Sequence, residues 1–583
     1  MADPGRPWWR DCVVYQIYPR SFADANDDGT GDVRGMIERL DYLRDLGVGA
    51  VWVSPWYPSP MADGGYDVAD YCDIDPSFGI LADADAFLAA AHERDIRVII
   101  DLVPNHCSVA HPLFQAALAA GPGSAEREWF HFRDGRGPDG ALPPNNWGSL
   151  FGGPAWERAQ GTAGPEQWYL HLFAPEQPDF NWANPAVADF FDQVIRFWLD
   201  RGVDGLRVDV ADSLAKQAGL PDTQIDPETG LGRATYYPGS PLWNQPELEA
   251  IQRRWRAVAE EYTDRHLGER IFVCEANVKP LDALIRFVDP GRMHTTFNFD
   301  MLWCEWDAGS LRAMIDRNLV AHNLVGAPTT WVLGNHDSTR VVTRYGKPET
   351  GKPFTLDGPD PAYQHRFADY FYPMPTDVDL GRRRARAAAL LELALPGTAY
   401  VYQGEELGLP EVEDLPVATL QDPSYFRTGG RVRGRDGCRV PLPWSGTRPP
   451  YGFGATAEPW LPQPGQWAAL SVAAQSADPD STLNLYRRAL AVRASHPALA
   501  GGSSPSAGGL AWAEDQPGGV LCFTREPGFT CLVNLRGEPV PLPAGADVLV
   551  ASGPLPGGTV PPDTAVWLDV ADLPQAGRQG RRG

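Results

Sequence analysis

The stretch from Gly205 to Ala211 contains the two residues whose spacing is most suggestive of chemistry. It follows a Gly- and Asp-containing turn and alternates apolar with charged residues, which is typical of a short strand whose two faces have different surroundings. Side chains alternate along a strand, so Arg207 and Asp209 point the same way. A neighbouring guanidinium favours an ionised carboxylate, which is the state that a nucleophile needs. Taken alone, such a pair is more often a structural ion pair. The residues at the ends of the other strands therefore determine whether a catalytic role is indicated.

Three carboxyl groups, those of Asp209, Glu275 and Asp337, each stand at the end of a different apolar stretch. Together they suit glycoside cleavage with retention, in which one carboxylate attacks the anomeric carbon and a protonated carboxyl protonates the leaving oxygen. Asp209 is the better nucleophile, because Arg207 keeps it ionised. Glu275 follows an apolar run and lies near other negative charge, both of which raise its pKa and suit a general acid. Asp337 would stabilise positive charge on the sugar ring and hold its hydroxyl groups.

The order of the predicted elements brings these distant residues together. Short apolar strands alternate with amphipathic helices, which indicates a parallel sheet covered on both faces. Eight such units over roughly 480 residues predict a TIM (β/α)8 barrel, in which the C-terminal ends of all strands share one mouth. The predicted strands are 13–17, 50–53, 97–103, 205–211, 271–274, 295–297, 330–333 and 398–402.

The barrel is interrupted once and extended once. Residues 107–181 are rich in Gly, Pro, Trp and Asn, and they are too long for an ordinary loop, so we expect an inserted lobe after the third strand. A helix over 482–495 closes the barrel. The remainder, 501–583, contains short alternating strands with Gly and Pro turns, which predicts an antiparallel β-sandwich. The barrel domain itself then consists of residues 1–106 and 182–500.

Composition narrows the class of partner and the compartment. The formal net charge of -25 argues against nucleic acid or an anionic membrane as a partner, because binding to phosphate needs a basic face. The N-terminal residues include no apolar leader and no later run is long enough to span a bilayer, which predicts a cytoplasmic protein. The eight cysteines lack zinc-like spacing, so we expect buried thiols, with Cys522 and Cys531 on neighbouring strands as the one candidate pair.

An early loop has the spacing of a calcium site. Oxygen ligands recur at every second position, as in the first part of a calcium-binding loop. The closing bidentate Glu is missing, because Gly35 stands in its place, and a solvated turn rich in Asp and Asn explains the spacing equally well. The candidate ligands are Asp24, Asn26, Asp28, Thr30 through its carbonyl oxygen, and Asp32.

The chain resembles glycoside hydrolase family 13, the α-amylase superfamily. The matching motifs, in the order of the family, are Asp101–His106, Gly205–Ala211, Val273–Ala276 and Asn335–Asp337. The resemblance implies that Asp209 is the nucleophile, Glu275 the acid/base and Asp337 the transition-state stabiliser. It also implies that four residues surround the sugar in the first subsite, with the tyrosine stacking on it: Tyr66, His106, Arg207 and His336.

Within the family the chain is similar to α-glucosidases and oligo-1,6-glucosidases. The segment Gln177–Trp182 resembles their marker, with Phe180 where Leu is usual. Asp67 and Arg435 resemble a pair that closes the pocket beyond the non-reducing end, which implies exo cleavage that releases glucose. The loop after Asp24 also resembles a calcium loop of this subgroup, where the metal is structural and takes no part in the chemistry.

The expected substrate is a small α-glucoside or oligosaccharide, and its linkage is harder to predict. Val210 resembles α-1,6-acting members, whereas its context and the segment 334–346 resemble α-glucosidases that cut α-1,4 bonds. We expect α-1,4 preference with mixed activity, because one side chain changes discrimination by only a few kcal/mol. Glucosyl transfer and maltose-to-trehalose isomerisation share the covalent intermediate and stay open, as does the oligomeric state. A non-catalytic barrel of this family would lack acidic residues and carry a membrane segment, neither of which holds here.

Overall fold

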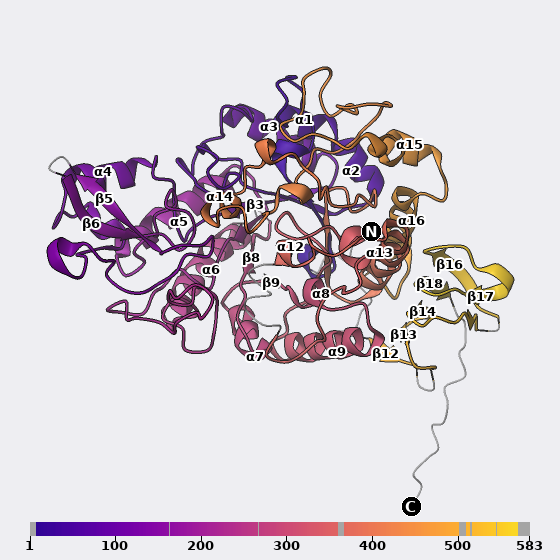
Figure 1. Cartoon of the computed structure of the whole chain (residues 1–583). Coiled ribbons are helices and arrows are strands. Elements are labelled where there is room, and N and C mark those ends of the chain that lie inside the picture. The colour runs from indigo at the N-terminus through magenta and orange to yellow at the C-terminus, as the bar shows by residue number, and fades with distance from the viewer. Residues whose placement is uncertain are drawn as a thin grey trace, which may run out of the picture.

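Eight parallel strands form the central sheet of the computed structural model of this chain (Figure 1). The structure describes residues 7–161, 164–265, 268–358, 367–500, 509–513, 516–543 and 545–569. The order of the strands in the sheet is β10-β11-β1-β2-β3-β7-β8-β9, so neighbours in sequence are neighbours in space, as in a TIM barrel. They are β1 (Val13–Ile17), β2 (Ala50–Val53), β3 (Arg97–Leu102), β7 (Gly205–Val208), β8 (Ile271–Glu275), β9 (Thr295–Phe297), β10 (Thr330–Val332) and β11 (Thr398–Tyr402).

A hydroxyl group joins the two ends of this sheet. Thr330 on β10 accepts a hydrogen bond from the backbone N–H of Asn298 at 3.2 Å and donates one to the carbonyl oxygen of Thr296 on β9 at 2.5 Å. These two hydrogen bonds connect β9 and β10, which stand at the two ends of the strand order, and so help to close the barrel. The predicted (β/α)8 barrel is confirmed.

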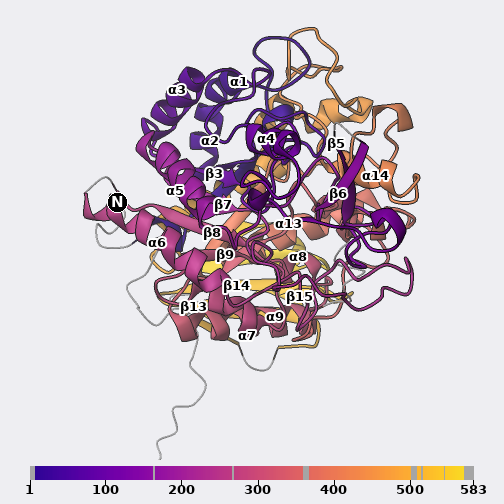
Figure 2. The same cartoon turned by 90° about the vertical axis from the view of Figure 1, so that its left-hand side faces the viewer.

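Helices surround the sheet (Figure 2), and local signals place their ends. Asn184 caps α5 by accepting the N–H of Ala186, and Pro185 occupies the first turn, where no donor is needed. The predicted helix 482–495 is α16. The main helices of the barrel domain are α1 (Val33–Glu38), α2 (Leu40–Leu46), α3 (Leu81–His92), α5 (Pro185–Asp200), α6 (Leu248–Asp264), α7 (Leu281–Leu284), α8 (Asp300–Trp303), α9 (Ala308–Val325), α10 (Val341–Tyr345), α12 (Phe367–Tyr370), α13 (Val378–Ala394), α14 (Pro423–Arg427), α15 (Val472–Ala477) and α16 (Thr482–Ser495).

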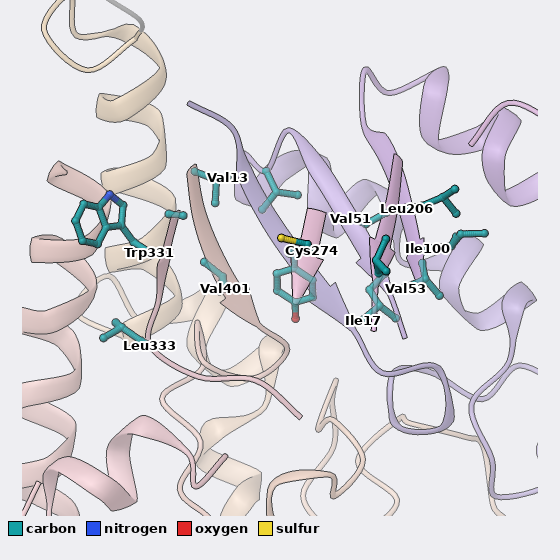
Figure 3. Packing of buried hydrophobic residues seen from close by; sticks show 14 of the residues in the cluster. Val13, Ile17, Val51, Val53, Ile100, Leu206, Cys274, Trp331, Leu333 and Val401 are labelled. Atoms are coloured by element: carbon teal, nitrogen blue, oxygen red, sulfur yellow. The ribbon is translucent and has the colours of Figure 1, made fainter. Parts of the chain in front are cut away.

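The strands divide their side chains between two buried surfaces. Alternate residues, among them those labelled in Figure 3, pack between strands and helices. The intervening residues belong to a second apolar cluster, which includes Trp52, Val273, Phe297 and Tyr400. Arg207 is aligned with Asp101 on one neighbouring strand and with Val273 on the other, so it shares the face of this second cluster. That face is the interior of the barrel, and it leads to the mouth.

The inserted segment after β3 has its own small sheet. It contains α4 (Pro112–Ala120), β4 (Phe132–Arg133), β5 (Trp156–Gly161) and β6 (Gly164–Leu170), and its three strands pair antiparallel in the order β4-β6-β5. An apolar cluster packs Trp147, Trp156 and Leu170 of this segment against Leu242 and Trp243 of the loop after β7. The expected lobe is therefore ordered, and in Figure 1 it lies on the opposite side of the barrel from the C-terminal strands.

The C-terminal strands form an antiparallel sandwich of unequal layers. A five-stranded sheet packs one face on the barrel, where Trp567 donates a hydrogen bond to the carbonyl oxygen of Leu390 on α13. A two-stranded ribbon covers the other face, with Val540 and Val560 in the shared apolar cluster. The strands are β12 (Leu510–Trp512), β13 (Val520–Arg525), β14 (Phe529–Asn534), β16 (Asp547–Ala551) and β18 (Thr564–Asp569), with β15 (Val540–Pro541) and β17 (Thr559–Val560) in the ribbon.

The candidate pairing of Cys522 with Cys531 is wrong. Cys522 stands opposite Leu532 and Cys531 opposite Phe523, so the two positions are offset by one residue and their side chains point to opposite faces of the sheet. Both thiols are buried and free. Across the described ranges, none of the helices combines the length and apolar character needed to cross a membrane.

Candidate active site

One buried guanidinium joins carboxyl groups from three adjacent strands. Arg207 Nη1 lies 2.7 Å from Asp101 Oδ1 and 2.6 Å from Asp209 Oδ1, and its Nη2 lies 2.8 Å from Glu275 Oε2. The expected meeting of Asp209 and Glu275 at one rim is therefore observed. The strand ends at Val208 instead of continuing to residue 211, because Val210 has a positive φ of 47° that turns the chain. This turn aims the Val210 N–H at Glu275 Oε2, 3.2 Å away.

The charge balance of this cluster differs from the prediction. Burial and the neighbouring Glu275 raise the pKa of Asp209 well above its usual range, and Arg207 only partly opposes them. Burial also raises the pKa of Asp101 to about 6, against the pull of Arg207. The expectation that Arg207 alone keeps Asp209 ionised neglected both effects. One cation facing three carboxyl groups favours a proton held within the cluster, and glycoside cleavage with retention needs one carboxylate and one protonated carboxyl.

Across the mouth, His336 is fixed as a neutral ring. Tyr66 stacks on it with a ring separation of 5.3 Å, and the Tyr66 hydroxyl lies 2.7 Å from Nε2. Gln16 on β1 lies 2.7 Å from Nδ1. Burial lowers the pKa of His336 to about 3, so the ring is uncharged at neutral pH. Tyr66 and His336 thus form one rigid wall of the predicted sugar subsite.

Asp337 is the carboxylate with the most cationic surroundings. Arg435 Nη1 lies 3.0 Å and Arg439 Nη2 lies 2.8 Å from Asp337 Oδ1. Burial acts to raise the pKa of Asp337, but His336 and the two guanidinium groups outweigh it and hold this pKa well below its usual range. Asp337 is therefore ionised, in contrast to the proton-holding cluster around Arg207.

The predicted pair of Asp67 and Arg435 is wrong, because Asp63 takes the place of Asp67. Arg435 Nη2 lies 2.7 Å from Asp63 Oδ1. The Asp67 carboxylate points into its own loop, where it accepts hydrogen bonds from the Ser59 hydroxyl and the backbone N–H groups of Ala62 and Asp63. Asp67 thus holds the turn that presents Asp63. Both aspartates lie in one Gly-rich loop, and nothing in their spacing distinguishes the two orientations.

His106 joins the same pocket through a residue that sequence analysis assigned only as part of a marker. The Gln177 amide nitrogen lies 3.1 Å from His106 Nε2 and donates to Asp63 Oδ2 at 3.1 Å. Burial lowers the pKa of His106 to about 4, so this ring is also neutral. No motif in the sequence indicates a role for Lys216, whose buried ammonium group lies 3.1 Å from Asp179 Oδ2. That ion pair ties the inserted segment to the loop after β7.

The candidate calcium loop lies apart from these residues and is closed by its own backbone. Asp24 accepts hydrogen bonds from the N–H groups of Asp27 and Gly29, and Asp32 accepts that of Gly35 at the start of α1. In the described part of the chain, no three His, Cys, Asp or Glu side chains converge on a position for a metal ion. Each carboxylate keeps lone pairs that a cation could use, and calcium stays a prediction.

A (β/α)8 barrel with paired carboxyl groups at its mouth is an arrangement suited to glycoside hydrolysis. Residues 16–354 and 364–502 match the family model described as the alpha amylase catalytic domain. The chain therefore belongs to the alpha-amylase family, and the resemblance stated from its motifs is confirmed.

Relatives and solved structures agree with this assignment. The chain is 37% identical to a probable alpha-glucosidase of Rhizobium meliloti, over 92% of this chain and 91% of the relative. It is 34% identical to an oligo-1,6-glucosidase of Parageobacillus thermoglucosidasius, over 84% of each protein. The crystal structure of an alpha-glucosyl transfer enzyme superimposes with a TM-score of 0.78 at 34% identity, covering 97% of this chain and 99% of that enzyme.

Proposed function

We propose that this hydrolase is a retaining, exo-acting α-glucosidase that releases glucose from the non-reducing ends of maltose and α-1,4-linked malto-oligosaccharides. The observation that carries the proposal is the pair of guanidinium groups at the mouth. Arg207 spans Asp209 and Glu275, while Arg435 spans Asp63 and Asp337. The carboxyl groups around Arg207 support cleavage of a glycosidic bond. The carboxylates around Arg435 support a pocket that is closed at one end and admits a single sugar.

Catalysis would proceed by two displacements. Asp209 attacks C1 of the glucosyl unit as the C1–O bond breaks, and Glu275 gives its proton to the departing oxygen. Glu275, now a carboxylate, then takes a proton from water, which attacks C1 and releases Asp209 with net retention. The fixed carboxylate of Asp337 stabilises positive charge on the ring in both transition states.

A direct interaction between Asp209 and Glu275 supports the retaining assignment. Both carboxyl groups touch one guanidinium and lie close enough for a hydrogen bond between them to contribute to the raised pKa of Asp209. Inverting enzymes need a wider separation, because a water molecule stands between sugar and base. A substrate that enters here would separate the two groups and leave the proton of the pair on Glu275, from which it passes to the departing oxygen as the C1–O bond breaks.

Transfer of glucose to a sugar acceptor is the second candidate, and the structural match to an alpha-glucosyl transfer enzyme favours it. Hydrolysis and transfer share the same covalent glucosyl-enzyme intermediate. Whether water or a sugar attacks this intermediate determines which of the two reactions occurs. The proposed preference for α-1,4 bonds is supported by the segment 334–346, which resembles that of α-1,4-acting α-glucosidases. Val210, which resembles α-1,6-acting members, argues against it. Initial rates on maltose, isomaltose, sucrose and trehalose would rank these alternatives directly.

Products from maltotetraose test the proposal. Glucose and maltotriose should form first, and proton NMR at early times should show α-glucose before mutarotation. Early maltose without glucose would refute exo action, and initial β-glucose would refute retention. Longer oligosaccharides that accumulate at high substrate concentration would instead support the transfer alternative.

We also propose that a structural Ca²⁺ ion occupies the loop 24–32, supported by the spacing of its oxygen ligands and the family resemblance. The side chains of Asp24, Asn26, Asp28 and Asp32, with the Thr30 carbonyl, would hold it. Its contribution would be to the stability of the loop, because the two displacements need no metal.

A further inference from the structure

We propose that Asp422 is a positioning residue of the donor pocket, which fixes the guanidinium of Arg435 in the orientation that closes the non-reducing end. This inference rests on the proposed function, in which Arg435 faces the sugar. Arg435 Nε lies 2.5 Å from Asp422 Oδ2, and the backbone N–H of Arg435 donates to the same oxygen at 3.0 Å. Asp422 is thus bonded to both ends of the residue that it orients.

The three carboxylates around Arg435 differ in their access to substrate. The exposed fraction of the side chain is 32% for Asp337, 5% for Asp63 and 0% for Asp422. Asp337 and Asp63 bind the two terminal nitrogens and keep some exposure, so sugar hydroxyl groups can compete for these contacts. Asp422, which is fully buried, binds the remaining nitrogen, Nε. Because the guanidinium is planar, a partner at Nε fixes the direction of both terminal nitrogens.

Asp422 is itself anchored, so it can act as a fixed reference. Its Oδ1 accepts the N–H of Ser424 at the start of α14, and its own N–H donates to Asp436 Oδ2 at 3.0 Å. Asp436 also accepts the N–H of Gln421 at 2.7 Å. Asp422 is therefore held by the Ser424 backbone and the Asp436 carboxylate, and its Oδ2 is left for Arg435.

The loop also ties the inserted segment to the pocket. Arg427 at the end of α14 donates two hydrogen bonds to the carbonyl oxygen of Gly152. The residue before Gly152, Phe151, lies under the Arg435 guanidinium, with its ring centroid 5.1 Å from the guanidinium carbon. The Arg435 guanidinium is thus packed against Phe151 and bonded to Asp422 through Nε. Loss of the Asp422 contact would let the guanidinium rotate.

A double-mutant cycle tests this role. Asp422→Asn keeps the size of the side chain and an oxygen for the Ser424 N–H, but it turns an amide N–H₂ toward Nε. We expect kcat/KM for p-nitrophenyl α-D-glucoside to fall about 10- to 100-fold, the range for loss of a hydrogen bond to a charged group. The loss should lie mainly in KM, because the pocket contact is present before bond cleavage. In an Arg435→Ala background the same change should alter kcat/KM less than about 2-fold.

Asp204→Asn is the matched control, because this buried carboxylate also binds guanidinium groups, those of Arg97 and Arg270, and a backbone N–H, but it lies immediately before β7 and does not contact Arg435 or its loop. Its effect on kcat/KM should be the same with and without Arg435. Equal losses from Asp422→Asn in both backgrounds would show a structural role only and overturn the proposal. Asp422→Ser, which keeps a helix-capping oxygen but leaves Nε without a partner, provides the second variant if Asp422→Asn does not fold.

Failure of the proposed function would be recognised separately. Release of p-nitrophenol reports formation of the glucosyl enzyme, whether water or a sugar is the acceptor. If the wild type releases none, the proposed function fails. Calorimetric binding of 1-deoxynojirimycin to the same four proteins would then give the coupling between Asp422 and Arg435 without turnover. Additive losses in that binding would also overturn the proposal.

Discussion

Replacing Glu405 by glutamine should remove a pH dependence of stability that the fold builds in. Glu405 follows β11 and is buried, with its Oε1 accepting the hydroxyl of Tyr486 at 2.8 Å. Burial raises its pKa from 4.5 to about 8, although the Tyr486 hydrogen bond opposes the rise and Glu406 adds to it. Nearby Glu392 is also buried, and neither of its oxygens accepts a hydrogen bond from the described residues.

The direction and size of this change in stability follow from the coupling between proton binding and folding. The folded state holds a proton that the unfolded chain releases, so the stabilisation is complete below about pH 4.5 and is lost as pH rises to about 8. A shift of about 3.5 units corresponds to at most about 5 kcal/mol, at 1.36 kcal/mol per unit. Glutamine does not titrate and can still accept from Tyr486. Glu405→Gln should therefore match the wild type near pH 4.5 and exceed it progressively toward pH 8.

Chemical denaturation at a series of pH values between 4.5 and 8 measures this difference. Glu93→Gln is the matched control, because Glu93 is exposed at the end of α3 and should leave the wild-type curve unchanged. Parallel curves for the wild type and Glu405→Gln across this pH window would refute the assignment of a buried, proton-holding carboxyl.

Three further predictions concern the site and the loop. Asp209→Asn should lower kcat at least about 1000-fold with an unchanged circular dichroism spectrum, since the nucleophile is lost, and near-normal turnover would contradict that role. Asp63→Asn should reduce kcat/KM about 10- to 100-fold, whereas Asp67→Asn should chiefly lower Tm, because only Asp63 meets Arg435; the reverse pattern would restore the sequence-based pair. A chelator should lower Tm by several degrees if calcium occupies the loop 24–32, and an unchanged Tm would count against the metal.

The strand ends show how much the sequence alone could settle. The apolar runs, their alternation with helices and the polar residue after each run predicted the barrel and the meeting of Asp209, Glu275 and Asp337 at one mouth. These inferences succeed because they depend on local periodicity and on a topology in which parallel strands all end on the same side. Residues distant in sequence need no further information to meet there.

Tertiary structure decided what a loop, a register or an environment controls. Asp63 and Asp67 share one turn, and backbone hydrogen bonds determine which of them faces Arg435. Cys522 and Cys531 lie on paired strands, but an offset of one residue places them on opposite faces. Burial and the neighbouring Glu275 raise the pKa of Asp209, although an arginine stands two residues before it and contacts it. Sequence thus determined which groups reach the mouth, while packing decided their orientation and protonation, because both depend on surroundings contributed by distant parts of the chain.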